Sequence, residues 1–223
     1  MPKQYSYEAN ELPEDATPAW SLIGTHNESV SKGILTIEKP SGTGGWYELF
    51  NADISNITGF TIEAKIKVIT SDEVSGYGCI LGVEFGAGEP WAYLYLRKDK
   101  IMINEGVVAP VEYEMDTTDG FHVYRFIVKD SICKAYVDGV LRLTATINNI
   151  QGNDTLAEFG TFDDPFEHQW DYVYFRTDGA FAPTSYLSAK RNMLSGYISY
   201  INQYVRNKFA NKNPLKLPDG RQW

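Results

Sequence analysis

The chain has no long apolar segment and no excess of basic residues. None of its apolar stretches approaches the ~20 residues that a membrane-spanning helix requires, so we expect no membrane insertion. Its start, Met1-Pro2-Lys3-Gln4-Tyr5, lacks the apolar core of a secretory signal, which predicts no signal peptide in this chain. The 20 basic and 29 acidic residues give a formal net charge of −9, which argues against a nucleic-acid partner.

Cysteines and common catalytic motifs are also scarce. Cys79 and Cys133 are the only cysteines of the sequence, and they match no metal-binding spacing. We expect both to be buried free thiols, with a disulfide between adjacent strands as the alternative. The sequence has no nucleophile elbow, phosphate-binding loop or zinc-protease helix, which excludes the enzyme classes that depend on these motifs.

Short runs with a period of two fill most of the chain. From about residue 20 to residue 178, apolar and polar residues alternate between turn residues, and the clearest run is Phe60–Val68. Asp138-Gly139 joins two such runs, which predicts a hairpin. On its second strand, the residues predicted to share the core face are Leu141, Leu143, Ala145 and Ile147. Many strands without intervening helices predict an all-β fold, a two-sheet antiparallel sandwich.

The period changes to that of a helix after Pro183. We therefore divide the chain into a sandwich at residues 1–182 and a C-terminal helix with an extended tail at residues 183–223. Residues 1–178 carry a net charge of −15 and residues 179–223 carry +6. The helix either packs on its own sandwich or docks on the acidic body of a second subunit, which would make a homo-oligomer. The residues predicted to make that oligomer contact are Leu187, Leu194, Tyr197, Ile198, Ile201, Tyr204 and Val205.

Several segments resemble the concanavalin A-like lectin/glucanase superfamily, in its laminin G-like branch. They are Trp20 with the strand Gly33–Ile37, the strand Gly59–Ala64, the hairpin Ala135–Leu141 and the closing strand Trp170–Arg176, which together span roughly residues 5 to 182. The resemblance implies a two-sheet jelly roll, in a superfamily of carbohydrate binders, glycosidases and parts of bacteriophage virions. The opening Glu11–Trp20 and the exit Thr177–Pro183 look like versions found in phage and bacterial cell-surface proteins.

The glucanase branch carries its carboxylates on one strand as Glu-x-Asp-x-x-Glu. The nearest stretch here is Ala157–Asp163, in which Gly160 occupies the place of the middle Asp, so we expect no catalytic residues. Glu112, Glu114 and Asp116 alternate on one face and are interpreted as protective charge on a solvated edge strand. His122 shares a face with Tyr124 and is predicted to lie at the edge of the core rather than to act as a base. A glycosidase stays open as an alternative.

Two strands present aromatic faces that suit a sugar. Because Ala92, Leu94 and Leu96 form an aliphatic face, the opposite face carries Trp91, Tyr93, Tyr95 and Arg97. The closing strand repeats the pattern with Trp170, Tyr172, Tyr174 and Arg176 opposite Val173. The alternative is that the first set of rings fills the space between the sheets and that the tyrosines of the second support the C-terminal helix. Trp46 and Tyr47 follow a glycine-rich loop and either line a rim or pack at the start of a strand.

Calcium is the one cofactor for which ligand types are present. Asp163, Asp164 and Glu167 could supply oxygen ligands, although a solvated acidic loop is the simpler interpretation and we expect no cofactor. The sequence thus predicts a non-catalytic binding or assembly module, in a phage virion or tail, that recognises a host-surface carbohydrate and associates with itself or with other virion proteins. A bacterial carbohydrate-binding protein, at the cell surface or extracellular, is the alternative.

Overall fold

The structure, a computed structural model, describes residues 4–39, 45–50, 58–71, 78–84, 91–104, 106–148, 156–161 and 166–183. All of them belong to the first of two compact units, Met1–Pro183. The second unit, Thr184–Trp223, lies outside the described residues, and with it lie the predicted C-terminal helix and its contact residues Leu187, Leu194, Tyr197, Ile198, Ile201, Tyr204 and Val205. In the part of the chain that is described, no helix has the length and apolarity to cross a membrane.

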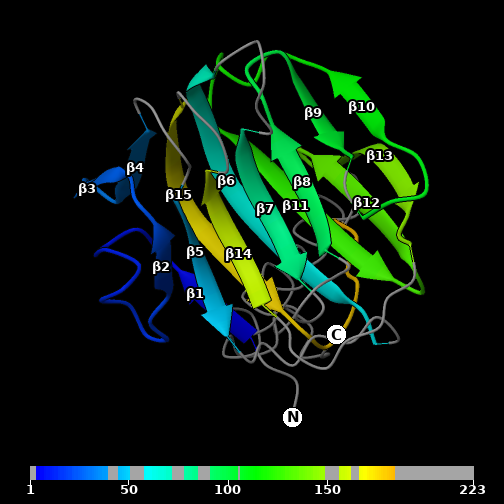
Figure 1. The fold of residues 1–223 in the computed structure, drawn as a ribbon, viewed down its shortest axis with the longest axis horizontal. Helices are drawn as coiled ribbons and strands as arrows, with labels where there is room; N and C mark the ends of the chain where they lie inside the picture. The colour runs from blue at the N-terminus through cyan, green and yellow to red at the C-terminus, as the bar shows by residue number, and fades with distance from the viewer. Residues whose placement is uncertain are drawn as a thin grey trace, which may run out of the picture. The chain divides into compact units, whose positions relative to one another are not determined.

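Two antiparallel sheets form the described part of the molecule (Figure 1). The eight-stranded sheet has the order β13-β12-β11-β6-β15-β4-β3, with β1 paired to β15. Its strands are β1 (Gln4–Tyr7), β3 (Asn27–Ser31), β4 (Ile34–Lys39), β6 (Phe60–Ser71), β11 (His122–Lys129), β12 (Ile132–Val137), β13 (Val140–Thr146) and β15 (Phe166–Arg176). The seven-stranded sheet has the order β10-β9-β8-β7-β14-β5-β2. Its strands are β2 (Ser21–Gly24), β5 (Gly45–Phe50), β7 (Cys79–Glu84), β8 (Trp91–Leu96), β9 (Lys100–Ile103), β10 (Val111–Glu114) and β14 (Leu156–Thr161).

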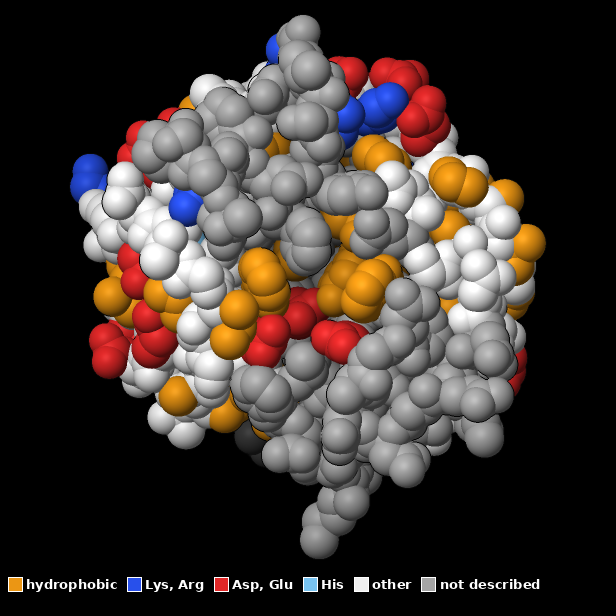
Figure 2. Space-filling view, in the orientation of Figure 1, with side chains coloured by type: hydrophobic (Ala, Val, Ile, Leu, Met, Phe, Trp, Pro, Cys, Tyr) orange, Lys and Arg blue, Asp and Glu red, His pale blue; other side chains and the backbone are white. Residues whose placement is uncertain are grey.

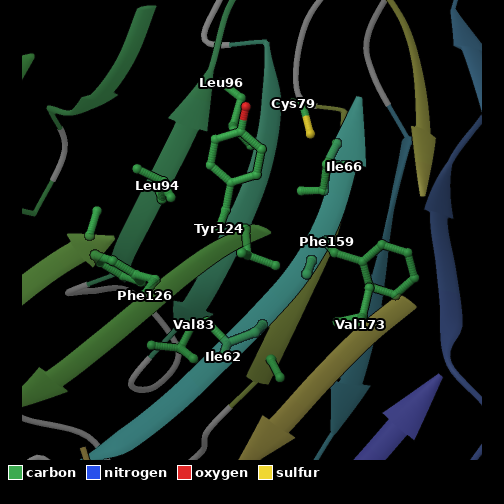
Figure 3. Close-up of a cluster of buried hydrophobic side chains, with 14 of the residues drawn as sticks. Ile62, Ile66, Cys79, Val83, Leu94, Leu96, Tyr124, Phe126, Phe159 and Val173 are labelled. Carbon is green, nitrogen blue, oxygen red and sulfur yellow. The ribbon is translucent and has the colours of Figure 1, made fainter. Parts of the chain in front are cut away.

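The core lies between the two sheets and follows from the alternation of each strand. In β6 the alternate residues Phe60, Ile62, Ala64, Ile66 and Val68 are all fully buried, as the sequence predicts. Side chains from both sheets meet in this layer (Figure 3). Ile62, Ile66, Tyr124, Phe126 and Val173 come from the eight-stranded sheet, and Cys79, Val83, Leu94, Leu96 and Phe159 come from the seven-stranded sheet. The predicted two-sheet sandwich is therefore confirmed.

The predicted hairpin joins β12 to β13. Asp138 and Gly139 have φ angles of 50° and 81°, the two positive values that a tight two-residue turn between twisted strands requires. The pairing register shifts between Ala135 and Tyr136, which marks a β-bulge in the hairpin. Leu143 is buried as predicted, but the prediction for Leu141 is wrong, since the bulge turns this side chain outward and leaves it 47% exposed.

A second bulge changes the prediction for the closing strand. The register of β15 against β6 shifts between Trp170 and Tyr172, so Asp171 has no partner in the ladder. Trp170 consequently lies in the core with 0% exposure, and its predicted place on the face of Tyr172 is wrong. Val173 is buried in the core, as expected.

Smaller predictions about single residues are confirmed. Cys79 and Cys133 are free thiols, and both are buried. The strand β10 is the edge of the seven-stranded sheet, with Glu112 and Glu114 exposed. Lys100 Nζ lies 2.9 Å from Glu112 Oε2, so the edge carries paired charge.

Candidate functional site

The outer face of the seven-stranded sheet, which is turned away from the core, carries rings and carboxyl groups. Two cross-strand rows form its centre: Glu48–Glu158–Gly82–Tyr93, and Trp46–Gly160–Ile80–Tyr95–Met102. Glu84 and Trp91 are cross-strand partners beside the first row. We call this surface the aromatic–acidic face, defined by Trp46, Glu48, Glu84, Trp91, Tyr93, Tyr95 and Glu158.

A glycine on β7 allows a hydrogen bond to span two strands. A Cβ atom on Gly82 would lie 2.5 Å from Cδ1 of Tyr93, so the tyrosine ring occupies the space above this glycine. The ring thereby reaches from β8 across β7, and its hydroxyl donates a hydrogen bond to Oε2 of Glu158 on β14. Burial and the charge of Glu158 raise the pKa of Tyr93, so the hydroxyl keeps its proton as the donor.

Glu158 is the cross-strand partner of Glu48 on β5. Nε1 of Trp46 donates to Oε1 of Glu48 at 2.9 Å. Tyr93 and Trp46 therefore hold the carboxyl groups of two neighbouring residues, Glu158 and Glu48. Burial of Glu158, together with the charges of Glu48 and Glu84, raises its pKa to about 8, against the lowering effect of the Tyr93 hydrogen bond. At neutral pH the carboxyl group of Glu158 is thus mainly protonated.

Gly160 has no room for a side chain. Its φ angle is 142°, and a Cβ atom there would lie 2.7 Å from the Cα atom of Trp46 on the adjacent strand β5. A backbone contact of this kind cannot be relieved by turning a side chain. The position where the glucanase pattern places its middle Asp is therefore closed to any residue but glycine.

The aromatic–acidic face has a buried floor and partly exposed walls. Tyr93, Tyr95 and Glu158 are at most 3% exposed, whereas Trp46 and Trp91 are partly exposed. The rings of Trp91 and Tyr93 are stacked, with centroids 6.3 Å apart. Figure 2 shows acidic side chains in a hollow in the middle of this face, over β7 and β14, with hydrophobic side chains beside them. Such a hollow combines flat apolar surfaces with fixed polar groups.

The structure places three of the four predicted β8 residues on this face. Trp91, Tyr93 and Tyr95 lie there, opposite the buried Ala92, Leu94 and Leu96, as the alternation predicts. Arg97 follows the end of β8, in the turn to β9, where its Nε atom lies 3.9 Å from Oδ1 of Asp99. The role of all four in binding sugar stays a prediction.

The other predicted group lies on the opposite side of the sandwich. Tyr172, Tyr174 and Arg176 line a cavity on the outer face of the eight-stranded sheet, so the structure does not bring them together with Trp91 and Tyr93. Their role in binding sugar also stays a prediction.

Sequence reasoning did not identify the carboxyl groups of the aromatic–acidic face as a group. The sequence pattern places Glu158 only in an incomplete catalytic motif, and it marks neither Glu48 nor Glu84 as a site residue. One local signal exists, since Glu48 follows Trp46 at the two-residue spacing of one strand face. The pairing of β5 with β14, which brings Glu48 to Glu158, is a long-range register that the sequence does not encode locally.

The acidic loop considered for calcium is only partly described. Asp163 and Asp164 lie outside the described residues, and Glu167 is partly buried in β15. Within the described ranges, no group of three or more His, Cys, Asp or Glu side chains is arranged to hold a metal ion.

Solved structures similar to this chain include enzymes and a lectin. An endo-β-1,3-glucanase from Pyrococcus furiosus superposes with a TM-score of 0.60 at 13% identity, over 79% of this chain and 94% of that chain. A prokaryotic β-1,3-1,4-glucanase (lichenase) derived from a mouse hindgut metagenome gives 0.56 at 11% identity, over 77% and 98%. The carbohydrate recognition domain of Emp46p, in its potassium-bound form, gives 0.57 at 14% identity, over 79% and 98%. The chain has the concanavalin A-like fold.

This concanavalin A-like fold is shared by glucanases and carbohydrate-binding lectins, so it leaves the activity open. The sequence matches no protein-family model and no curated protein. At these identities the similarity concerns the fold alone, and the laminin G-like branch and the phage assignment stay predictions.

Proposed function

We propose that the chain is a carbohydrate-binding protein that uses the aromatic–acidic face and has no hydrolytic activity. The observation that supports binding is the arrangement of flat rings around hydrogen-bonding carboxyl groups, with Trp46 and Trp91 partly exposed at its sides. Sugar rings bind by placing their C–H faces on aromatic rings while polar groups orient their hydroxyls. Glu48 and Glu158 are already held by Trp46 and Tyr93, so little entropy is lost in ordering them.

One feature argues for binding without hydrolysis. Gly160 closes the position of a second carboxylate on β14, so this strand cannot carry the glucanase pattern.

Trp91 offers the sharpest test, because it is partly exposed whereas Tyr93 is buried and bonded to Glu158. A glycan array, followed by calorimetry on the best ligand, should show binding by the wild type. We expect Trp91→Ala to weaken this binding at least tenfold, which corresponds to about 1.4 kcal/mol or more. Tyr136→Ala, on the other sheet, serves as the control and should bind like the wild type. Equal affinity of Trp91→Ala and wild type would contradict the proposed site.

Glycoside hydrolysis is a second candidate, favoured by the raised pKa of Glu158. A protonated carboxyl group at neutral pH is what a general acid requires, and the charge of Glu84 acts on the same carboxyl group. The test is release of reducing sugar from neutral polysaccharides by the wild type, Glu158→Gln and Glu84→Gln. Turnover that is lost in both variants would establish an enzyme and overturn the non-catalytic proposal.

We also propose the biological setting that the sequence suggests. The ligand would be a host-surface glycan, and the protein would be part of a phage virion or tail, or alternatively a bacterial surface or extracellular protein. The support is the resemblance of residues 11–20 and 177–183 to such proteins, together with the carbohydrate-type face. Genes for tail and lysis proteins beside its own gene would favour the virion, whereas neighbouring genes of polysaccharide metabolism would contradict it.

A further inference from the structure

The outer face of the eight-stranded sheet contains a cavity that the proposed function does not use. Its volume is about 470 Å³, and the side chains that line it include Glu63, Arg125, Tyr172, Tyr174, Arg176 and Phe181. They come from β6, β11, β15 and the segment that follows β15. The volume falls within the ~300–1,000 Å³ of typical small-molecule sites.

The polar floor of this cavity is held by a network around Glu63. Nε and Nη2 of Arg125 lie 2.6 Å and 2.5 Å from Oε2 of Glu63. The hydroxyl of Tyr172 donates to the other carboxylate oxygen, Oε1, at 2.9 Å. The carboxylate and the guanidinium are thus fixed as two planar groups before any ligand arrives.

One wall of the cavity is the segment after β15, which is fastened across the sheet. Thr61 Oγ1 donates to the carbonyl oxygen of Gly179 at 2.8 Å and accepts from the backbone N–H of Phe181 at 2.8 Å. Arg125 Nη1 donates to the carbonyl oxygen of Phe181 at 3.2 Å. These bonds hold the ring of Phe181 in place at the cavity.

A second planar cation completes the wall. The guanidinium of Arg176 makes two bonds of 2.5 Å to the carboxylate of Asp178 and lies 4.0 Å from the ring centroid of Phe181. Because Arg125 and Arg176 each have a carboxylate partner, the cavity offers no uncompensated positive charge to a phosphate or a carboxylate. Glu8, which also lines the cavity, makes an anion still less favourable.

We propose that this cavity is a second saccharide site, which takes a neutral pyranose ring. The rings of Tyr172, Tyr174 and Phe181 supply flat apolar surfaces, and the planar groups of Glu63 and Arg125 supply acceptors and donors that match neighbouring hydroxyls. The site lies on the opposite side of the sandwich from the aromatic–acidic face, so the protein would hold two sugar chains at once. Two weak sites on one protein raise its avidity for a surface that displays many glycans.

The test is a calorimetric titration of the full chain with a panel of neutral oligosaccharides of glucose, galactose and mannose. We expect two equivalents per wild-type chain for at least one member of the panel, and one equivalent for Trp91→Ala. The binding that remains in Trp91→Ala should weaken at least tenfold when Tyr174→Ala is added. Tyr172→Phe keeps the ring but removes the hydrogen bond to Glu63. Added to Trp91→Ala, it should weaken the remaining sugar binding several-fold.

Controls separate this proposal from the proposed function. Tyr136→Ala, on the same sheet but outside the cavity lining, should leave both equivalents unchanged. Arg176→Lys, which keeps the charge but loses the planar stack on Phe181, replaces Tyr174→Ala if that variant does not fold. If the aromatic–acidic face does not bind sugar but the cavity does, the wild type should still bind one equivalent, and that equivalent should be weakened by Tyr174→Ala. If the wild type binds a single equivalent of sugar that is lost in Trp91→Ala and is unchanged in Tyr174→Ala, the second site alone is overturned. If neither the wild type nor any variant binds a sugar of the panel, both sites are overturned.

Discussion

Glu158 lies on the aromatic–acidic face between the hydroxyl of Tyr93 and the carboxyl group of Glu48, with only 2% of its surface exposed. Its raised pKa means that the folded protein holds a proton there which the unfolded chain releases near pH 4.5. Between that pH and about pH 8 Glu158 binds more proton in the folded state than in the unfolded state, so its contribution to stability falls as the pH rises.

Glu158→Gln should remove this pH dependence. Gln cannot ionise but keeps the shape and the hydrogen-bonding capacity of a protonated Glu. From about pH 5 to about pH 8 we expect the free energy of unfolding of the wild type to fall relative to that of the variant, by up to ~1.4 kcal/mol per pH unit. Denaturant unfolding across this range measures both. Glu114→Gln, which changes an exposed edge carboxylate, should keep the wild-type slope, and an equal slope in all three proteins would contradict the assignment.

Gly160→Ala tests the closed position on β14. The added methyl group would meet the backbone of Trp46 at 2.7 Å in a backbone conformation that other residues rarely adopt, so we expect a loss of about 2–4 kcal/mol in the free energy of unfolding. The matched control is Gly120→Ala, where a Cβ atom meets nothing within 4 Å, and which should change stability by no more than about 0.5 kcal/mol. Equal stability of the two variants in thermal unfolding would show that β14 tolerates a side chain.

The sequence predicted residue faces well wherever a strand alternates without interruption. Trp91, Tyr93 and Tyr95 lie opposite Leu94 and its neighbours because nothing disturbs the period of β8. The acidic partners were missed because their proximity depends on which strand lies beside which. Glu48 and Glu158 are 110 positions apart in the sequence and meet only through the order β7-β14-β5.

At the scale of the elements, the β12–β13 hairpin is anchored by its own turn residue. The carboxylate of Asp138 accepts a hydrogen bond from the backbone N–H of Val123 at 2.9 Å, and its other oxygen lies 2.7 Å from Nδ1 of His122. Nε2 of His122 lies 2.7 Å from Asp119. Burial lowers the pKa of His122, but the hydrogen bonds to Asp138 and Asp119 outweigh it and raise the pKa overall. The turn is thereby fastened to β11.

Asp138→Ala and Asp138→Asn should separate the two parts of this anchor. Alanine loses both contacts and disfavours the positive φ, so we expect a loss of about 1–2 kcal/mol in the free energy of unfolding. Asparagine tolerates positive φ and can still accept a hydrogen bond from the backbone N–H of Val123. The loss of unfolding free energy in Asp138→Asn should therefore be smaller, and it should come only from the missing ion pair with protonated His122. That charge-dependent part is present at low pH and disappears as the pH rises through the raised pKa of His122. Urea unfolding at acidic and alkaline pH measures both parts, and identical losses at both pH values would contradict the ion pair.

Bulges explain where the element predictions failed. Leu141 and Trp170 each follow the alternation of the sequence, but each lies beside a shift in pairing register that reverses its face. A bulge inserts one residue on one strand relative to its partner. Its position therefore depends on both strands, and the period of either strand alone does not reveal it.

At the scale of the whole molecule, aromatic and polar side chains gather on both outer faces of the sandwich. The aromatic–acidic face carries Glu48, Glu84 and Glu158 without a cation among its defining residues, whereas the cavity on the other sheet pairs Glu63 with Arg125. The sandwich is acidic, and the +6 of residues 179–223 is the largest basic concentration in the sequence. This opposition of charge is the basis for the predicted association of the C-terminal segment with the sandwich of a second subunit.

Light scattering of the full chain and of a chain truncated after Pro183 tests this association. We expect the full chain to be an oligomer and the truncated chain to be a monomer, because truncation removes the predicted contact residues Leu187 to Val205 together with all the basic residues of the C-terminal segment. If charge drives the contact, raising the salt from about 0.1 M to about 1 M should weaken it, since the screening length falls from about 10 Å to about 3 Å. Oligomers that persist at high salt would assign the contact to the apolar residues of the segment instead. A full chain that is monomeric at every salt concentration would contradict the prediction, and the sandwich with its two outer faces would then act as a single binding unit.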